Sequence, residues 1–136
     1  MTQPNMRLAD AQFEVTKALP NGAAAVNSDS MDLEVSSDGL HLANCELEIT
    51  APALDTADLP DTKTMTYKVE ESDDDSSFNT VADSVLVQTG ASGAGAAAAT
   101  VRVRLPSDVK RYVRVTATNS GTGDASDKSL TAKLLF

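Results

Sequence analysis

Basic residues gather in one short part of an acidic chain. Five of its eleven Lys and Arg residues lie between positions 98 and 118, although the formal net charge is -9. Arg and Tyr are enriched at protein interfaces, and Arg binds carboxylates through paired hydrogen bonds. This chemistry indicates contact with a partner rather than catalysis. The candidate interface residues are Arg102, Arg104, Lys110, Arg111, Tyr112 and Arg114.

These residues are predicted to share one face of a β-hairpin. Apolar residues alternate with the basic ones on both sides of a turn at residues 106–110, so the apolar side chains point inward and the basic ones outward. An alternative is an ordinary charged face, paired with the chain's own acidic strands at Asp32, Glu34, Glu46 and Glu48. Nucleic-acid contact is a weaker alternative, because most domains that bind phosphate backbones are basic overall.

The sequence offers little material for a catalytic centre. Its one histidine, His41, lies four residues from its one cysteine, Cys45. Along a strand these side chains would be roughly 13 Å apart, too far for the hydrogen bond that activates a thiolate. We therefore expect no enzyme activity, no catalytic residues and no cofactor. A single cysteine also excludes an intramolecular disulfide framework, and Cys45 is predicted to be a small buried residue.

Two further segments have suggestive compositions. Residues 70–75 hold five carboxylates, but their spacing does not match a calcium-binding loop. A solvated turn is predicted there, with a weak cation site as the alternative, and no metal site is assigned. Residues 90–95 contain three glycines but lack the Lys-Ser/Thr pair of a phosphate-binding loop. They are predicted to form a flexible loop of small residues.

Alternation with a period of two residues dominates the rest of the chain, and it is typical of strands with one buried face. Turn residues such as Pro20-Asn21-Gly22 separate the alternating runs. No segment has convincing helical periodicity. The sequence predicts an all-β fold, an antiparallel β-sandwich or jelly roll without substantial helix. About eight strands are expected, near residues 10–17, 31–36, 42–50, 63–71, 78–88, 97–105, 110–118 and 128–136.

A chain of 136 residues is expected to form one domain over residues 10–136, preceded by an N-terminal arm at residues 1–9. The core is predicted to be thin, because the chain has no Trp and only five aromatic residues. Contacts between subunits are therefore expected to add stability. Neither a secretory signal nor an apolar run long enough for a membrane span is recognised, so we expect synthesis in a reducing cytoplasm and no membrane partner.

The second half of the chain resembles the capsid decoration (cement) proteins of tailed bacteriophages. The resemblance rests on Val101–Leu105, Pro106, the run Lys110-Arg111-Tyr112-Val113-Arg114-Val115, and the apolar ending Leu130–Phe136. Upstream, Tyr67–Asp74 followed by Ser77-Phe78 is similar to a hairpin of the same family. This hairpin also occurs in other phage β-sandwich modules, including tail proteins.

The resemblance implies a trimeric jelly-roll protein on the outer surface of a phage head, where it would clamp neighbouring major capsid proteins. It supplies no catalytic residues. The expected partners are the major capsid protein and further copies of this chain, without nucleic acid. Two alternatives remain open: another virion component, such as a tail or head-completion β-sandwich, and a carbohydrate-binding β-sandwich module.

Overall fold

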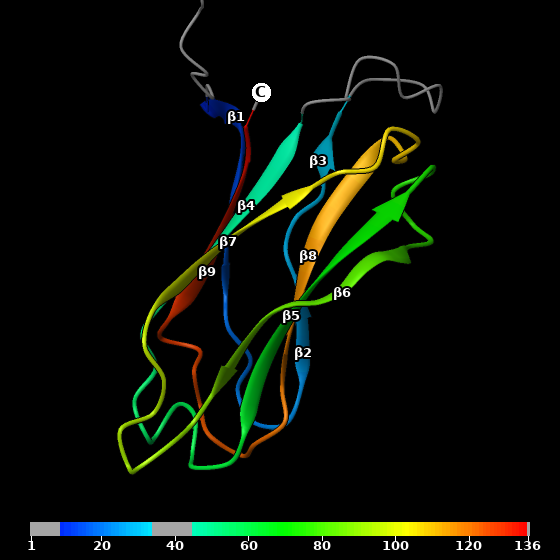
Figure 1. Ribbon diagram of the computed structural model, residues 1–136. Helices are drawn as coiled ribbons and strands as arrows, with labels where there is room; N and C mark the ends of the chain where they lie inside the picture. The colour runs from blue at the N-terminus through cyan, green and yellow to red at the C-terminus, as the bar shows by residue number, and fades with distance from the viewer. Residues whose placement is uncertain (1–8, 34–44, 136) are drawn as a thin grey trace, which may run out of the picture.

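The computed structural model describes residues 9–33 and 45–135, and for residues 9–12 it describes the backbone. These residues form two antiparallel sheets packed face to face (Figure 1). The first sheet has the strand order β1 (Ala9–Ala18), β9 (Ser129–Leu135), β4 (Glu46–Ala51), β7 (Ala99–Arg104). The second has the order β2 (Ala25–Asn27), β8 (Tyr112–Asn119), β5 (Thr64–Ser72), β6 (Asn79–Thr89), and β3 (Met31–Asp32) also pairs with β8.

This strand order is that of a jelly roll. Because β2 and β3 both pair with β8, they count as one interrupted strand, and the described residues then form eight strands. Numbered along the chain, the two sheets read 1-8-3-6 and 2-7-4-5. This is two Greek keys folded over one core. The predicted antiparallel sandwich is confirmed, and the described residues contain no helix, let alone one long and apolar enough to span a membrane.

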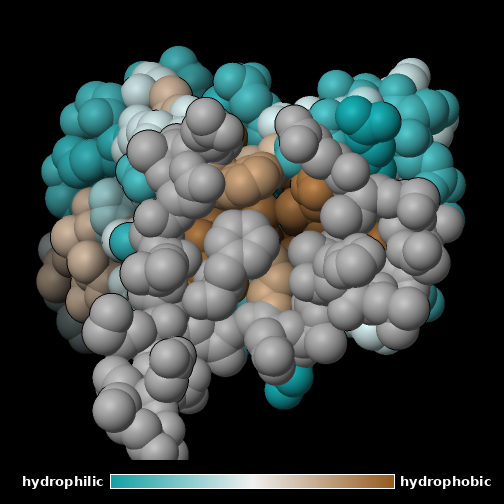
Figure 2. All heavy atoms as spheres, turned by 90° about the horizontal axis from the view of Figure 1, so that it is seen from above, coloured by the Kyte–Doolittle hydropathy of each residue, from teal (hydrophilic) through white to brown (hydrophobic). Residues whose placement is uncertain are grey.

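The core lies between the two sheets and is built from the alternating apolar positions. Leu47 and Ile49 of the first sheet and Tyr67, Val69 and Val115 of the second have no exposed surface. Figure 2, a view onto one end, shows hydrophobic residues in the middle with hydrophilic residues on either side. Alternation therefore positions the polar residues on the two outer faces, as predicted.

The sandwich has two ends made of loops. The upper end of Figure 1 contains residues 73–78 and 105–111, and the lower end contains residues 19–24, 52–63, 90–98 and 120–128. We call these the upper and lower ends below.

One strand was missed by the sequence prediction, and several predicted features lie partly or wholly outside the described residues. The short strand β2 was not predicted, because three residues are too few to show an alternating pattern. The strand expected near 31–36 is described only as Met31–Asp32. The proposed N-terminal arm at 1–9 falls almost wholly outside the described residues, as do Glu34 and His41.

Candidate protein interface

The predicted basic hairpin is wrong as a structure, because β7 and β8 belong to different sheets. Residues 105–111 carry the chain from one sheet across to the other. Leu105 and Val109 anchor this crossing, with exposures of 2% and 1%. Arg102 and Arg104 consequently lie on the outer face of the first sheet, and Arg114 lies on that of the second. The expected patch of Arg102, Arg104, Tyr112 and Arg114 on one face does not exist.

The structure does bring Lys110, Arg111 and Tyr112 together at the upper end. The Lys110 ammonium lies 3.0 Å from Asp73 Oδ2, and the Lys110 backbone N–H donates to Glu71 Oε2 at 2.8 Å. The hydrogen bond to Asp73 raises the pKa of Lys110. These contacts join the crossing loop to the β5–β6 turn.

Arg111 extends the same cluster to β3. Its Nε and Nη2 donate to the two carboxylate oxygens of Asp32 at 2.7 and 2.8 Å. Its guanidinium carbon also lies 5.2 Å from the centre of the Tyr112 ring, within the range of a cation–π contact. Two parallel hydrogen bonds hold this guanidinium in one orientation.

Arg114 is enclosed on the outer face of the second sheet. Its Nε donates to Glu70 Oε1 at 3.1 Å, and its guanidinium carbon lies 3.7 Å from the centre of the Phe78 ring. Glu70 also accepts from the Thr116 hydroxyl and lies 3.3 Å from the Lys68 ammonium. Burial alone would raise the pKa of Glu70, but the hydrogen bonds from Thr116, Arg114 and Lys68 outweigh it and hold the pKa below its ordinary value.

Arg102 belongs to a separate network on the first sheet. Glu48 accepts from Arg102 Nε at 2.8 Å, and its other oxygen lies 3.3 Å from the Lys133 ammonium. The hydrogen bond from Arg102 lowers the pKa of Glu48 despite the opposing effect of burial, and Lys133 lowers it further. Arg104 lies two residue pairs further along the strands, in register with Glu46.

Many of these basic residues therefore form ion pairs within the chain, as the predicted alternative expects. Asp32 and Glu48 each bind one of the basic residues, as that alternative expects. Glu70, Glu71 and Asp73, which it did not include, bind Arg114 and Lys110. Contact of the six basic-segment residues with another protein stays a prediction.

The acidic segment 70–75 is not a single solvated turn. Glu70 is 7% exposed and pairs across the sheet, whereas Asp73 points to the crossing loop. Asp74 accepts from the backbone N–H groups of Ser76 and Ser77 at 3.0 and 2.9 Å and so shapes the turn. Within residues 9–33 and 45–135, no three His, Cys, Asp or Glu side chains are grouped to hold a metal ion. The thiol of Cys45 is buried, as predicted.

Sequence reasoning missed the close packing of the lower end. A Cβ on Gly95 would lie 2.0 Å from the Leu54 carbonyl oxygen, and one on Gly90 would lie 2.2 Å from that of Pro60. The predicted flexible loop at 90–95 instead presses two of its three glycines against neighbouring backbone. The signal in the sequence was the glycines themselves, since glycine allows backbones to approach closely.

A buried hydrogen-bond network fixes the same loops. Gln88 donates from Nε2 to the carbonyl oxygens of Pro52 and Ala97 at 2.8 and 2.9 Å, and it accepts from the Tyr67 hydroxyl at 2.8 Å. Burial raises the pKa of Tyr67. The side-chain amide of Gln88 in β6 thus connects the second sheet to the loop that follows β4 and to the loop that precedes β7.

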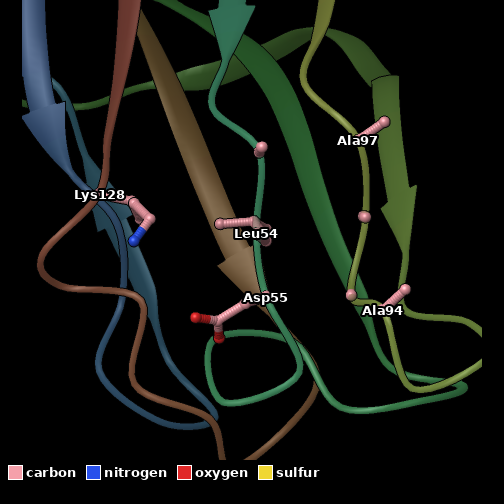
Figure 3. A pocket seen from close by; sticks show the side chains of 8 residues that line it. Leu54, Asp55, Ala94, Ala97 and Lys128 are labelled. Atoms are coloured by element: carbon pink, nitrogen blue, oxygen red, sulfur yellow. The ribbon is translucent and has the colours of Figure 1, made fainter.

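A pocket of about 570 Å³ opens between these loops (Figure 3). Leu54 and Asp55 lie on one wall, Ala94 and Ala97 on another, and Lys128 at the rim. Lys128 is 3.0 Å from Asp127 and 3.7 Å from Asp58. Two of the segments that line the pocket are joined, because Leu54 and Ala96 exchange two backbone hydrogen bonds of 2.9 and 2.8 Å.

Comparison with known proteins adds a family and a fold neighbour. Residues 13–134 match the family model described as Bbp16. The crystal structure of PBSX exported protein XepA is similar in fold, with a TM-score of 0.51, 16% identity and 94% of this chain covered. The match spans 36% of that protein, so this chain corresponds to about a third of its length.

A second solved structure is more distant. The C-terminal family 22 carbohydrate-binding module of Clostridium thermocellum Xyn10B aligns over 93% of this chain and 85% of the module, with 10% identity and a TM-score of 0.38. No curated protein matches the sequence.

Proposed function

The chain belongs to the Bbp16 family, a phage-related family, and from that membership we propose that it is a structural protein of the phage particle. We propose that it binds the outer surface of the capsid and cements neighbouring major capsid proteins. The family match, which spans nearly all of a jelly-roll sandwich, is the observation that carries the assignment to the phage particle. The resemblance of residues 64–136 to decoration proteins supports the same role.

The structure is suited to binding rather than catalysis. Its thiol is buried, and the described carboxylates with the lowest exposure, Asp58, Glu70 and Glu48, each have a lysine or arginine within 4 Å. Paired groups of this kind hold a surface in one shape. A rigid surface loses little entropy on association, so more of the contact energy appears as affinity. We therefore propose that the protein acts by shape and charge complementarity and not as an enzyme.

Repetition would strengthen such contacts. A closed oligomer presents the same surface several times, and each bound subunit raises the effective concentration of the next. We propose a homotrimer as the attached unit. Light scattering on the purified protein should give the mass of three chains, and a monomer at micromolar concentration would contradict this part of the proposal.

The particle itself provides the decisive test. Purified virions should contain hundreds of copies of the chain on the outer capsid surface, and heads assembled without it should release DNA at lower temperature. A few copies per particle would instead indicate a tail or head-completion component. Absence from the particle would overturn the virion assignment, and binding on a glycan array would favour the carbohydrate-binding alternative.

A further inference from the structure

Strand β6 forms one edge of the second sheet. It pairs with β5 on one side and has no strand on the other among the described residues. Its lower part pairs regularly, with Thr66 opposite Val87 and Thr64 opposite Thr89. The register shifts further up, between Tyr67 and Val69, so the regular edge is short.

The direction of the backbone groups follows from two hydrogen bonds. Ser120 N–H donates to the Thr64 carbonyl, so the backbone groups of Thr64 face β8. Gly90 N–H donates to the Lys63 carbonyl, so the N–H of Gly90 faces β5. Backbone groups alternate in direction along a strand. Gln88 and Leu86 therefore face β5, and the N–H and C=O groups of Val87 and Thr89 face the open edge. Neither residue takes part in the backbone hydrogen bonds of the described turns and loops, and among the described strands β6 pairs with β5 alone.

The side chains around this edge are uncharged. Val87 is 46% exposed and is the one large hydrophobic residue exposed to this degree among those described. Val87 lies in register with Thr66, Thr118 and Ala25 of the neighbouring strands, and the four residues form one row across the sheet. An open edge with an apolar side chain and no charge is a ready template for another strand.

Two of the other edges are less suited to strand addition. On β7, the next edge in the first sheet, Leu105 N–H donates to Cys45 and so faces β4. By alternation the outward backbone groups are those of Thr100, Arg102 and Arg104. The long charged side chains of the two arginines discourage strand addition along that part of the edge. The edge formed by β2 is three residues long. The uncharged part of β6 therefore differs from the charged part of the β7 edge and from the short edge of β2.

We propose that the β6 edge at Val87 and Thr89 receives an extended segment of the shell protein, which adds a strand to the second sheet. This inference rests on the proposed function and names the surface that faces the capsid partner. Main-chain hydrogen bonds would provide affinity, and an uncharged side chain beside Val87 would provide fit.

Charge favours a different protein over a second β6. Asp83 lies exposed just above the regular edge, next to Ser84, whose φ of 49° marks the kink where regular pairing stops. Strand β6 contains no Lys or Arg, so pairing with its own copy would leave both Asp83 carboxylates without a cation. A partner segment with a basic residue beside Asp83 would neutralise it.

Amide hydrogen exchange on particles carrying the protein tests this proposal. The amides of Val87 and Thr89 should exchange rapidly in the free protein and at least tenfold more slowly on the capsid. The amide of Thr16 is the control: Leu19 N–H donates to Lys128 and faces β9, so by alternation the Thr16 amide faces outward on the β1 edge. It should exchange equally in both states. Equal exchange at Val87 in both states would overturn the inference.

Two variants of Val87 provide a second test. Val87→Pro removes the outward N–H and leaves the bonds to β5 intact, and Thr16→Pro makes the same change on the other sheet. Capsid occupancy should fall at least tenfold for Val87→Pro and stay unchanged for Thr16→Pro. Val87→Lys retains the N–H but places a charge on the edge, and it should also lower capsid occupancy. This variant still tests the edge if Val87→Pro does not fold.

The outcomes separate this inference from the proposed function. A protein that does not bind capsids at all contradicts the proposed function. Normal occupancy with Val87→Lys and unprotected edge amides contradicts the edge assignment alone. The Val87 and Thr89 amides could instead become protected from exchange in the free protein as its concentration and its mass in solution rise. This result would show that a second copy occupies the edge, and it would overturn the assignment to the shell protein.

Discussion

Backbone packs against backbone at the lower end of the sandwich, whereas charged side chains hold the loops of the upper end. Gly95 and Gly90 lie so close to residues 54 and 60 that no Cβ fits, and Gln88 binds two carbonyl groups of the same loops. At the upper end, Lys110 and Arg111 bind Asp73 and Asp32. The lower end should therefore resist salt and acid but tolerate few substitutions, and the upper end should show the opposite behaviour.

Gly95→Ala should have the largest effect, because its Cβ would overlap the Leu54 carbonyl and its φ is +67°. We expect a loss of more than about 4 kcal/mol in the free energy of unfolding, or no folded protein. Gly93→Ala is the matched control, since φ is +66° but no atom lies within 4 Å of the added Cβ. It should cost about 1 kcal/mol. Similar losses in urea unfolding for the two variants would contradict close packing as the cause.

Gln88→Leu should rank second. It leaves the Tyr67 hydroxyl and the carbonyl groups of Pro52 and Ala97 without their partner, and each unsatisfied buried group is costly. We expect a loss of about 3 kcal/mol, against about 1 kcal/mol for Tyr67→Phe, which removes one bond. The loss should not change with salt. A loss below that of Tyr67→Phe would show that the Gln88 network does not stabilise this end.

Glu70→Gln should follow, with a loss of about 2 kcal/mol at neutral pH, typical of hydrogen bonds to a charged group. The pKa of the Glu70 carboxyl lies below its ordinary value of 4.5 in the folded protein. Its ionised form therefore stabilises the fold above pH 4.5, and this contribution is lost as the pH falls through the folded pKa.

Melting temperatures recorded from pH 7 to pH 3 provide the measurement. The wild-type protein should lose its advantage over Glu70→Gln below pH 4.5, and the two curves should converge. Gln88→Leu should instead stay below the wild type by a constant amount. A constant difference between Glu70→Gln and the wild type would contradict a stabilising carboxylate.

Arg111→Ala should have the smallest effect, because the Arg111 side chain is 49% exposed. Exposed ion pairs contribute about 0.2–1 kcal/mol, and salt screens them. We expect a loss below about 1 kcal/mol at low salt that disappears at high salt. Arg111→Lys should retain part of the stability. A loss that persists at high salt would indicate packing rather than charge.

Alternation predicted the fold because each buried strand face requires apolar residues at every second position. Tyr67 and Val69, and likewise Val113 and Val115, are buried as their pattern indicates. The partner of each strand could not be predicted in the same way. The turn at 106–110 looks like a hairpin turn, but Leu105 and Val109 enter the core and direct the chain to the opposite sheet.

The candidate interface shows the same limit. The residue types along 98–118 correctly indicated carboxylate pairing, and Asp32 and Glu48 were named as possible partners. Glu70 could not be identified, because its contacts with Arg114 and Thr116 depend on the register of β5 with β8. The edge at Val87 was equally hidden, since a strand at an edge and a strand inside a sheet have similar sequences.

The position of β9 has a consequence for how the chain reaches its fold. This strand lies between β1 and β4, although β1 is the first described strand and β9 the last. The first sheet therefore cannot be completed until residues 129–135 have left the ribosome. Until then β1 has no partner and β4 has one free side. Completion of the first sheet should be slow, as expected for distant pairings, and should fail when the seven-residue strand β9 is deleted.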